Sequence, residues 1–364
     1  MVRHTYIGLT AVAAMAAMLA AGCEKEIKVD VDAQDARVVV QGENIVGQSL
    51  AFNLTYSRPT FSTFYVRNGE DYFPRITDAT LTLSVDGGAT MTASRDGGTY
   101  TFAHTPQPGE VLSLGIAVPG RQPLSSTATV PYEPVVSDID TSTSVRATDY
   151  YTAIYFNISF TLNDRATSDD YYSVRILRVD SAFHTVRDTA GNITAQDTST
   201  SSNYRYFNCT DYLLVSNAEI DLEDPTATST FSGYEMLFTD ASINGTSHTI
   251  RLETEEWNDY YIDEYKADRS GTDSFAIRST YYLVTTAYSR DHYLYRQTRN
   301  SYSNDELLSL ISEPVQIHSN IEGGIGIFGV SARRINRVCT TVSTEVYNGS
   351  WETPAEEQPN STDR

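Results

Sequence analysis

The feature of the sequence that most constrains its fold is a turn signal repeated between short alternating segments. Residues 78–102 read DATLTLSVDGGATMTASRDGGTYTF, with Asp-Gly-Gly at 86–88 and again at 96–98. Glycine reaches the positive φ angles of tight hairpin turns, and alternation of apolar with polar residues lays one face of a strand against a core. The segment therefore predicts two successive β-hairpins.

The same pattern covers most of the chain and predicts a mainly β protein. Short strands with closely spaced turns run through residues 36–130, and we expect an N-terminal β-sandwich that resembles the immunoglobulin or transthyretin type. Pro131 and Pro134 mark a boundary. Longer alternating runs over residues 131–346 predict a second, larger β-sandwich-like domain.

One segment of the second domain changes to a helical period, and residues 289–311 are expected to form a helical insert. The hydroxyl of Ser289 is expected to cap a helix, and Asp291 suits its positive end. Asn304 is expected to begin a second short helix. The sequence VSARRINRVCTTVSTEV at 330–346 is expected to form a closing pair of strands.

Residues 181–203 are polar and break the strand period, so we expect a long exposed excursion there. It carries or borders two three-residue matches to a bacterial O-glycosylation signal, centred on Ser181 and Thr189. Such matches also arise by chance in a threonine-rich chain.

The two ends of the chain predict an anchored protein with a loose tail. Residues 1–22 carry an early arginine and an apolar run, too short for a typical bilayer span, that ends LAAGC. This favours a cleaved lipoprotein signal with lipid on Cys23, although Leu19 stands one place earlier than usual; an ordinary signal peptide is the alternative. Residues 23–35 are expected to form a tether, and residues 347–364 are expected to be disordered.

Composition restricts the partners and the compartment. The formal net charge of −21 opposes nucleic-acid binding, which needs a basic surface. Of the three cysteines, lipidation of Cys23 would leave Cys209 and Cys339 as a candidate disulfide in an oxidising compartment. Two separate buried thiols are the alternative. Neither cysteine has a cysteine or histidine at ligand spacing, so we expect no metal site there and no cofactor.

The run GIGIFG at 324–329 matches the glycine fingerprint of dinucleotide-binding folds. That fingerprint requires a helix after the glycines, because the helix N-terminus binds the pyrophosphate. Here an apolar, strand-like run follows instead. We therefore expect a glycine-rich strand packed closely against other backbone, with Ile325, Ile327 and Phe328 in the core.

The same region carries a family resemblance. EPVQIHSNIEGGIGIFGVSA at 313–332, together with VVVQG, DATLTLSVDGG and LFTDASINGTSHTIRL, resembles domain-of-unknown-function family 4249. The resemblance covers nearly the whole mature chain. It implies a Bacteroidetes-type outer-membrane lipoprotein, often made beside a TonB-dependent transporter, and it implies no known activity or catalytic residue. The acidic residues just after Cys23 also resemble the surface-export signal of such lipoproteins.

Residues that could carry chemistry are few. HExxH, GxSxG and Walker A motifs are absent, and only His292 and His318 stand near a distinctive motif, where a structural role is expected. The acidic stretch ETEEWNDYYIDEY lacks the spacing of a calcium loop and is expected to be a solvated loop. Its rings Trp257, Tyr260 and Tyr261 are the candidate ligand-binding residues, because flat aromatic faces stack on sugars and peptides.

These observations lead to one expected function and one rival. We expect a non-enzymatic, surface-exposed outer-membrane lipoprotein that binds a peptide or glycan as an accessory of a TonB-dependent transporter. The rival is a structural or adhesive surface protein that binds host or matrix partners. A hydrolase is a third alternative, which paired catalytic groups in a cleft would favour.

Overall fold

The computed structural model describes residues 36–57, 74–147, 152–166, 168–211, 214, 231–256, 273–304 and 316–346. Strands of three sheets make up 62% of these residues, so the prediction of a mainly β fold is confirmed. Cys23, the signal and tether segments and the C-terminal tail lie outside the described residues. So do Trp257, Tyr260, Tyr261 and the second predicted helix after Asn304.

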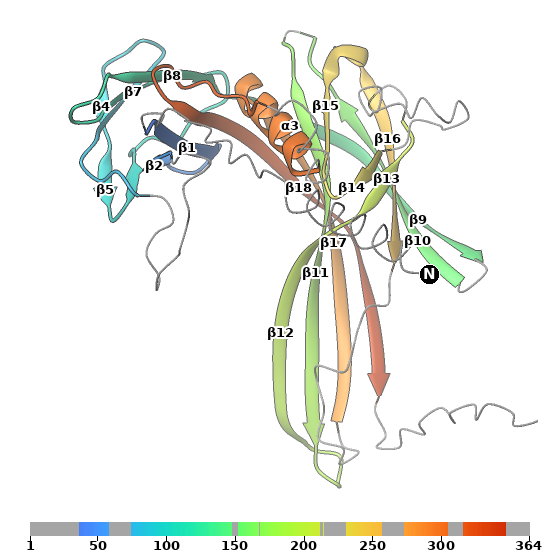
Figure 1. Cartoon of the computed structure of the whole chain (residues 1–364). Helices are drawn as coiled ribbons and strands as arrows, with labels where there is room; N and C mark the ends of the chain where they lie inside the picture. The colour runs from blue at the N-terminus through green and yellow to red at the C-terminus, as the bar shows by residue number, and fades with distance from the viewer. Residues whose placement is uncertain are drawn as a thin grey trace, which may run out of the picture. The chain divides into compact units, whose positions relative to one another are not determined.

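The largest sheet has nine strands and combines both ends of the described chain (Figure 1). Its order is β12 (Ile193–Arg205), β11 (Tyr171–Arg187), β17 (Asp273–Tyr288), β18 (Ile325–Val346), β1 (Val38–Ile45), β2 (Ala51–Tyr56), β6 (Thr99–Thr101) and β5 (Ser94–Asp96), with β15 (Met236–Thr239) paired to β11. Strand β1 runs parallel to β18, with Val40 opposite Gly326. The sheet therefore joins residues on both sides of the predicted boundary at Pro131.

Two smaller sheets complete the fold. One has the order β14 (Phe231–Gly233), β13 (Phe207–Cys209), β16 (Ser247–Glu256), β10 (Thr152–Asn163) and β9 (Val135–Ala147). The other has the order β4 (Met91–Thr92), β3 (Thr80–Val85), β7 (Val111–Ala117) and β8 (Leu124–Thr129).

Each small sheet shares an apolar core with part of the large one, which is sandwich-like packing. The first core holds Phe52 and Leu54 of β2, Leu83 of β3 and Phe328 of β18. The second core is built in the same way from the five-stranded sheet and from β11, β15 and β17. Alternating apolar residues on each strand supply these cores, as the two-residue period of a strand requires.

Both predicted hairpins are confirmed. Strands β3 and β4 pair across the turn at 86–88, and β5 and β6 pair across the turn at 96–98. Asp86, Gly87 and Gly97 have φ angles of 51°, 70° and 57°, the positive values that the turn chemistry predicts.

The glycine-rich run is the start of strand β18, so the strand interpretation is confirmed. Ile327 and Phe328 are buried and Ile325 is half-buried. Gly326 has φ of 114°, and a Cβ atom there would lie 2.0 Å from the backbone oxygen of Val40. The glycine thus allows β18 to approach β1, and strand continues to Val346 where a nucleotide-binding fold would begin a helix.

Two detailed predictions from the sequence are corrected by the structure. The closing pair of strands is the single strand β18, because β17 pairs with it from Ser331 to Val346; a bulge at Val338, opposite Tyr281 and Tyr282, absorbs the irregularity. The polar segment at 181–203 is largely exposed, as expected, but it forms most of the regular hairpin of β11 and β12 and is no irregular excursion, since backbone pairing needs no apolar period.

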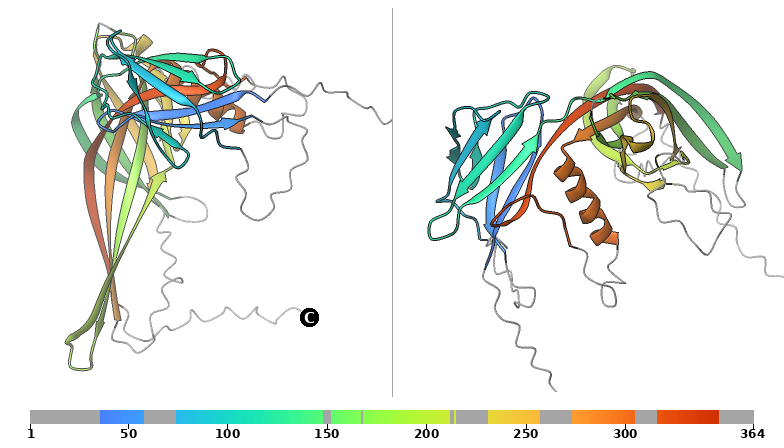
Figure 2. Two further views of the ribbon diagram at one scale, coloured as in Figure 1. Left: turned by 90° about the vertical axis from the view of Figure 1, so that its left-hand side faces the viewer. Right: turned by 90° about the horizontal axis from the view of Figure 1, so that it is seen from above.

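The predicted helix is α3 (Arg290–Asn304), with Asp291 in its first turn. Figure 2 shows this helix beside β18. The two elements approach closely at Gly329, because a Cβ atom added there would lie 2.5 Å from the ring of His292. The hydroxyl of Ser289 accepts a hydrogen bond from the Val330 N–H at 3.2 Å, so its predicted capping role is wrong. Among the described residues, no helix combines the length and the apolar character of a membrane span.

Candidate functional site

Polar side chains form cross-strand rows on the outer face of the five-stranded sheet. Asn157 of β10 lies opposite Ser142 of β9 on one side and Glu253 of β16 on the other. Glu253 in turn lies opposite Asn208 of β13, so one row crosses four strands. Neighbouring strands are about 4.8 Å apart, so each row repeats hydrogen-bonding groups at that spacing.

The local sequence dictates this division of faces. In β10, Phe156, Ile158 and Phe160 are buried, whereas Asn157 and Ser159 between them point outward. The same alternation in β16 buries the isoleucine and leucine at 250 and 252 and leaves the positions between them outside. Because the side-chain period of a strand is two, the apolar core positions fix which polar residues share the outer face.

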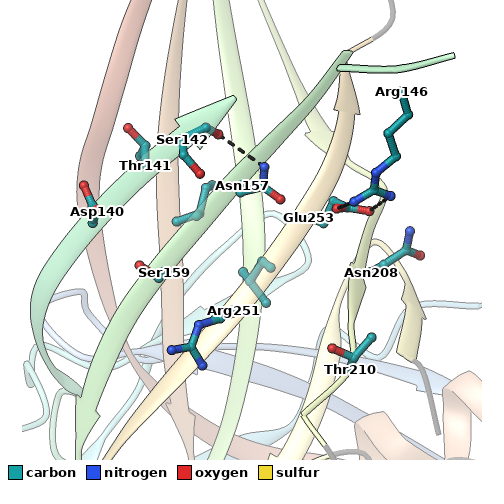
Figure 3. Close-up of a pocket in the computed structure, with 12 residues that line it drawn as sticks. Asp140, Thr141, Ser142, Arg146, Asn157, Ser159, Asn208, Thr210, Arg251 and Glu253 are labelled. Carbon is teal, nitrogen blue, oxygen red and sulfur yellow. Dashed lines mark hydrogen bonds and ion pairs between the residues drawn. The ribbon is translucent and has the colours of Figure 1, made fainter. Parts of the chain in front are cut away.

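These rows line an open groove of about 480 Å³ (Figure 3). Its lining consists of Asp140, Thr141, Ser142, Arg146, Asn157, Ile158, Ser159, Asn208, Thr210, Arg251, Leu252 and Glu253. Ten of the twelve are polar or charged. A groove of this composition offers many hydrogen-bond donors and acceptors.

The charges in the groove balance. Arg146 donates two hydrogen bonds to the carboxylate of Glu253, one of 2.9 Å, and its guanidinium lies 4.3 Å from the centre of the Tyr155 ring. The hydrogen bond to Glu253 is the main cause that raises the pKa of Arg146. With Asp140 and Arg251, the lining holds two carboxylates and two guanidinium groups, and therefore no net formal charge. The groove thus differs in formal charge from the chain as a whole, whose net charge is −21.

Two exposed tyrosines lie beside this face. Tyr206 and Tyr234 are 50% and 60% exposed, and their ring centres are 5.4 Å apart in an edge-to-face arrangement. Tyr206 lies two residues before Asn208 of the groove, and Tyr234 lies two residues after Ser232, whose hydroxyl donates a hydrogen bond to the Asn208 side chain at 2.7 Å. The sequence alone does not indicate this pair of rings, because their proximity depends on the pairing of β13 with β14 and β16.

The predicted Cys209–Cys339 disulfide is wrong, since no disulfide joins the two residues. Cys209 lies in the five-stranded sheet and Cys339 in the nine-stranded sheet, on opposite sides of one core. Facing sheets pack about 10 Å apart, whereas the Cα atoms of a disulfide lie within about 7 Å. Burial raises the pKa of the Cys209 thiol.

A second cavity, of about 590 Å³, lies at the start of β18. Arg37, Tyr295 and His318 are among its lining residues. His318 Nε2 lies 2.9 Å from Asp291 Oδ1. The backbone N–H of His318 donates a hydrogen bond to the Thr298 hydroxyl. A histidine–carboxylate pair is one element of a hydrolase, but among the described residues no serine or cysteine side chain hydrogen-bonds to His318.

An ionic network holds α3 against the large sheet. His292 is 3% exposed, and its Nε2 lies 3.2 Å from Glu43 Oε2 on β1. Arg299 and Arg296 approach the same carboxylate at 3.3 and 3.7 Å. The hydrogen bond from His292 is the largest cause that lowers the pKa of Glu43; burial opposes it, and the nearby positive charges add to it.

Glu235 forms the second centre of this network. It accepts hydrogen bonds from Arg296 and, at 3.0 Å, from the Tyr288 hydroxyl, and Arg175 lies 3.7 Å away. Burial alone would raise the pKa of Glu235, but the charges of Arg296 and Arg175 outweigh it and hold that pKa low. The carboxylates thus stay charged and structural, which agrees with the structural role expected for His292.

The fold and the groove define a class of protein: a mainly β chain with two sandwich-like cores and an open, hydrogen-bonding sheet face. The family described as "Domain of unknown function (DUF4249)" matches residues 24–337. The chain belongs to this family, as the sequence motifs indicated.

Other comparisons add little. No curated protein matches the sequence. The enzymatically active domain of the bacteriophage CBA120 tailspike protein 4 is 12% identical, with a TM-score of 0.10, over 34% of this chain and 16% of that one. The Clostridium perfringens NetB toxin in its membrane-inserted form is 6% identical, with a TM-score of 0.09, over 73% and 93% of the two chains. Neither likeness bears on the function.

Proposed function

We propose that this protein is a lipid-anchored, non-enzymatic binding component of a TonB-dependent nutrient uptake system at the outer-membrane surface. The observation that carries the proposal is the groove on the five-stranded sheet, whose aligned polar side chains carry no net charge. In this proposal the groove binds an uncharged stretch of a glycan or peptide.

The chemistry of the groove suits such a ligand. Asparagine amides and serine hydroxyls, as at Asn157, Asn208 and Ser159, both donate and accept hydrogen bonds, as sugar hydroxyls and peptide groups require. The exposed rings of Tyr206 and Tyr234 supply flat surfaces for stacking. An open face gives modest affinity, but a lipid tether beside a transporter raises the effective ligand concentration there.

The anchored location is supported by the ending LAAGC before the acidic tether. To test the whole proposal, we would tag the C-terminus, solubilise native outer membranes in mild detergent and identify what co-purifies. A near-stoichiometric TonB-dependent transporter is expected. A Cys23→Ala variant, which cannot take the lipid, should leave the membrane fraction. Recovery of the lipoprotein alone, while known transporter complexes survive the same detergent, would overturn the transporter partnership.

The groove is tested separately on glycan and peptide arrays with the purified chain. Asn157→Ala and Arg251→Ala should each weaken binding of any retained probe by about tenfold, because each removes one or two polar contacts. Arg334→Ala, an exposed arginine paired with Glu133, is the matched control and should bind as the wild type does. Equal binding by all variants would remove the groove from the proposal.

One observation favours adhesion as a second candidate function. Strand β9 is the last strand of its sheet, with no further strand paired to its outer edge among the described residues. Val135 and Val145 on it are more than half exposed. An open strand edge can pair with an extended segment of another protein. Binding to immobilised host matrix proteins that Val145→Lys abolishes would favour this candidate.

A further inference from the structure

Three aspartates outside the lining of the groove meet where two chain connections touch. Asp164 follows β10, Asp170 precedes β11, and Asp240 opens the short 3-10 helix η1 (Asp240–Ser242). One carboxylate oxygen from each lies within 4.8 Å of the other two. The Asp240 N–H donates to the Asp170 carbonyl at 3.1 Å, so the backbone itself holds the two connections together.

The Asp240 side chain is the observation that gives this cluster meaning. Asp240 is only 3% exposed, and its Oδ2 atom is buried with no hydrogen-bond partner. A buried carboxylate oxygen without a partner costs free energy unless a proton or a cation compensates it. This oxygen belongs to the carboxylate group of Asp240, which lies close to the carboxylates of Asp164 and Asp170. A cation bound among the three carboxylates would compensate its negative charge.

The neighbouring groups neutralise the cluster only in part. Among the described residues, Arg165 is the one cation that forms an ion pair with it, at 3.5 Å from Asp170. Asp164 accepts from the Tyr172 hydroxyl and the Gly245 N–H, both at 2.8 Å, but these donors carry no charge. Three carboxylates with one guanidinium leave an excess of negative charge in a largely buried place.

We infer that Asp164, Asp170 and Asp240 bind a Ca²⁺ ion. The donors are all oxygen atoms, which hard cations prefer, whereas zinc favours nitrogen and sulfur ligands. Ca²⁺ takes six to eight oxygen ligands at about 2.3–2.6 Å in flexible geometry, so three carboxylate oxygens within 4.8 Å of one another can share one ion. Mg²⁺ demands near-ideal octahedral geometry and gives up its waters reluctantly, so a largely buried cluster of carboxylates suits it less.

The ion would tie the β10–β11 connection to the segment that leads into β16. Strand β16 carries Arg251 and Glu253 of the groove, but the calcium site stands independently of the function proposed for that groove. With three carboxylates in two loops, the affinity should resemble that of extracellular calcium modules, with a Kd of about 10⁻⁴–10⁻³ M.

Calorimetric titration and thermal unfolding of the purified full-length chain, stripped with EDTA and then given CaCl₂, test the inference. We expect one Ca²⁺ per chain and a Tm increase of about 2–5 °C at 10 mM Ca²⁺, with a smaller response to MgCl₂. Asp240→Asn keeps the shape of the side chain and removes its charge. This variant should fold as stably as the wild type without calcium and lose the calcium response.

Asp164→Asn is the second variant, for use if Asp240→Asn does not fold, and it should also lose the response. Asp96→Asn, an exposed aspartate at the β5–β6 turn, is the matched control and should keep it. An absent heat and Tm shift in the wild type, or an unchanged shift in both cluster variants, would overturn the site. An equal response to Mg²⁺ would overturn its assignment to calcium.

Discussion

The close approach of β18 to β1 makes Gly326→Ala the sharpest test of the fold. Gly326 has φ of 114°, and its new Cβ would lie 2.0 Å from the oxygen and 2.8 Å from the nitrogen of Val40. Both are backbone atoms, so no side-chain rotation relieves the overlap. An ordinary contact of about 3.5 Å would need a shift of about 1.5 Å, enough to break the hydrogen bonds between the two strands.

Two costs add in this variant. The positive φ costs an alanine about 1–2 kcal/mol, and overpacking adds about 1–3 kcal/mol, so the free energy of unfolding should fall by about 3 kcal/mol or more. Gly47→Ala is the matched control, because Gly47 has φ of 86° but nothing within 4 Å of the added Cβ. In the control, the free energy of unfolding should fall only by the cost of the positive φ angle, about 1–2 kcal/mol.

Urea unfolding followed by tyrosine and tryptophan fluorescence measures both variants. The difference between them isolates the contact with β1 from the backbone strain. If Gly326→Ala loses no more stability than Gly47→Ala, the parallel pairing of β1 with β18 is wrong as described.

Three further predictions follow from the ionic network at α3 and from the two thiols. Glu235→Gln should lower the free energy of unfolding by about 3–5 kcal/mol, because it leaves buried guanidinium groups without a carboxylate. Glu133→Gln, which breaks an exposed pair, is the control and should lower it by less than about 1 kcal/mol. Urea unfolding of the two variants and the wild type measures both values. The hydrogen bond from its histidine partner lowers the pKa of Glu43, so this residue stabilises the fold above the unfolded-state pKa of about 4.3 and loses that contribution as the pH falls through its lower folded-state pKa. The free energy of unfolding should therefore fall less steeply between pH 7 and pH 3 for Glu43→Gln than for the wild type. Equal slopes for the two proteins would contradict this. Alkylation of the denatured, unreduced chain should label both Cys209 and Cys339; failure of both to react would restore the disulfide.

Much of the fold could be predicted because its signals are local. The Asp-Gly-Gly turns at 86–88 and 96–98 and the helical period after Ser289 depend on residues close together in the sequence. Alternation in β10 and β16 also predicted which of their residues face a core. A turn needs only its own φ angles, and a strand face only its own period.

The predictions that failed concern partners distant in sequence. Nothing near Cys209 indicates that a whole core separates it from Cys339. Nothing in 330–346 alone distinguishes one long strand from a pair, because the β17 strand that decides it lies more than forty residues earlier. The candidate rings Trp257, Tyr260 and Tyr261 lie outside the described residues, so their role stays a prediction.

The sequence by itself determined the mainly β class, the hairpins, the strand nature of the glycine run and membership of the family. Only the tertiary structure decided that Ser142, Asn157, Glu253 and Asn208 form one row, and that three aspartates from two connections converge. The physical reason is that turns and strand faces follow from local backbone preferences, whereas strand order and register are chosen by burying the apolar faces of the whole chain at once. The binding surfaces are made by that register.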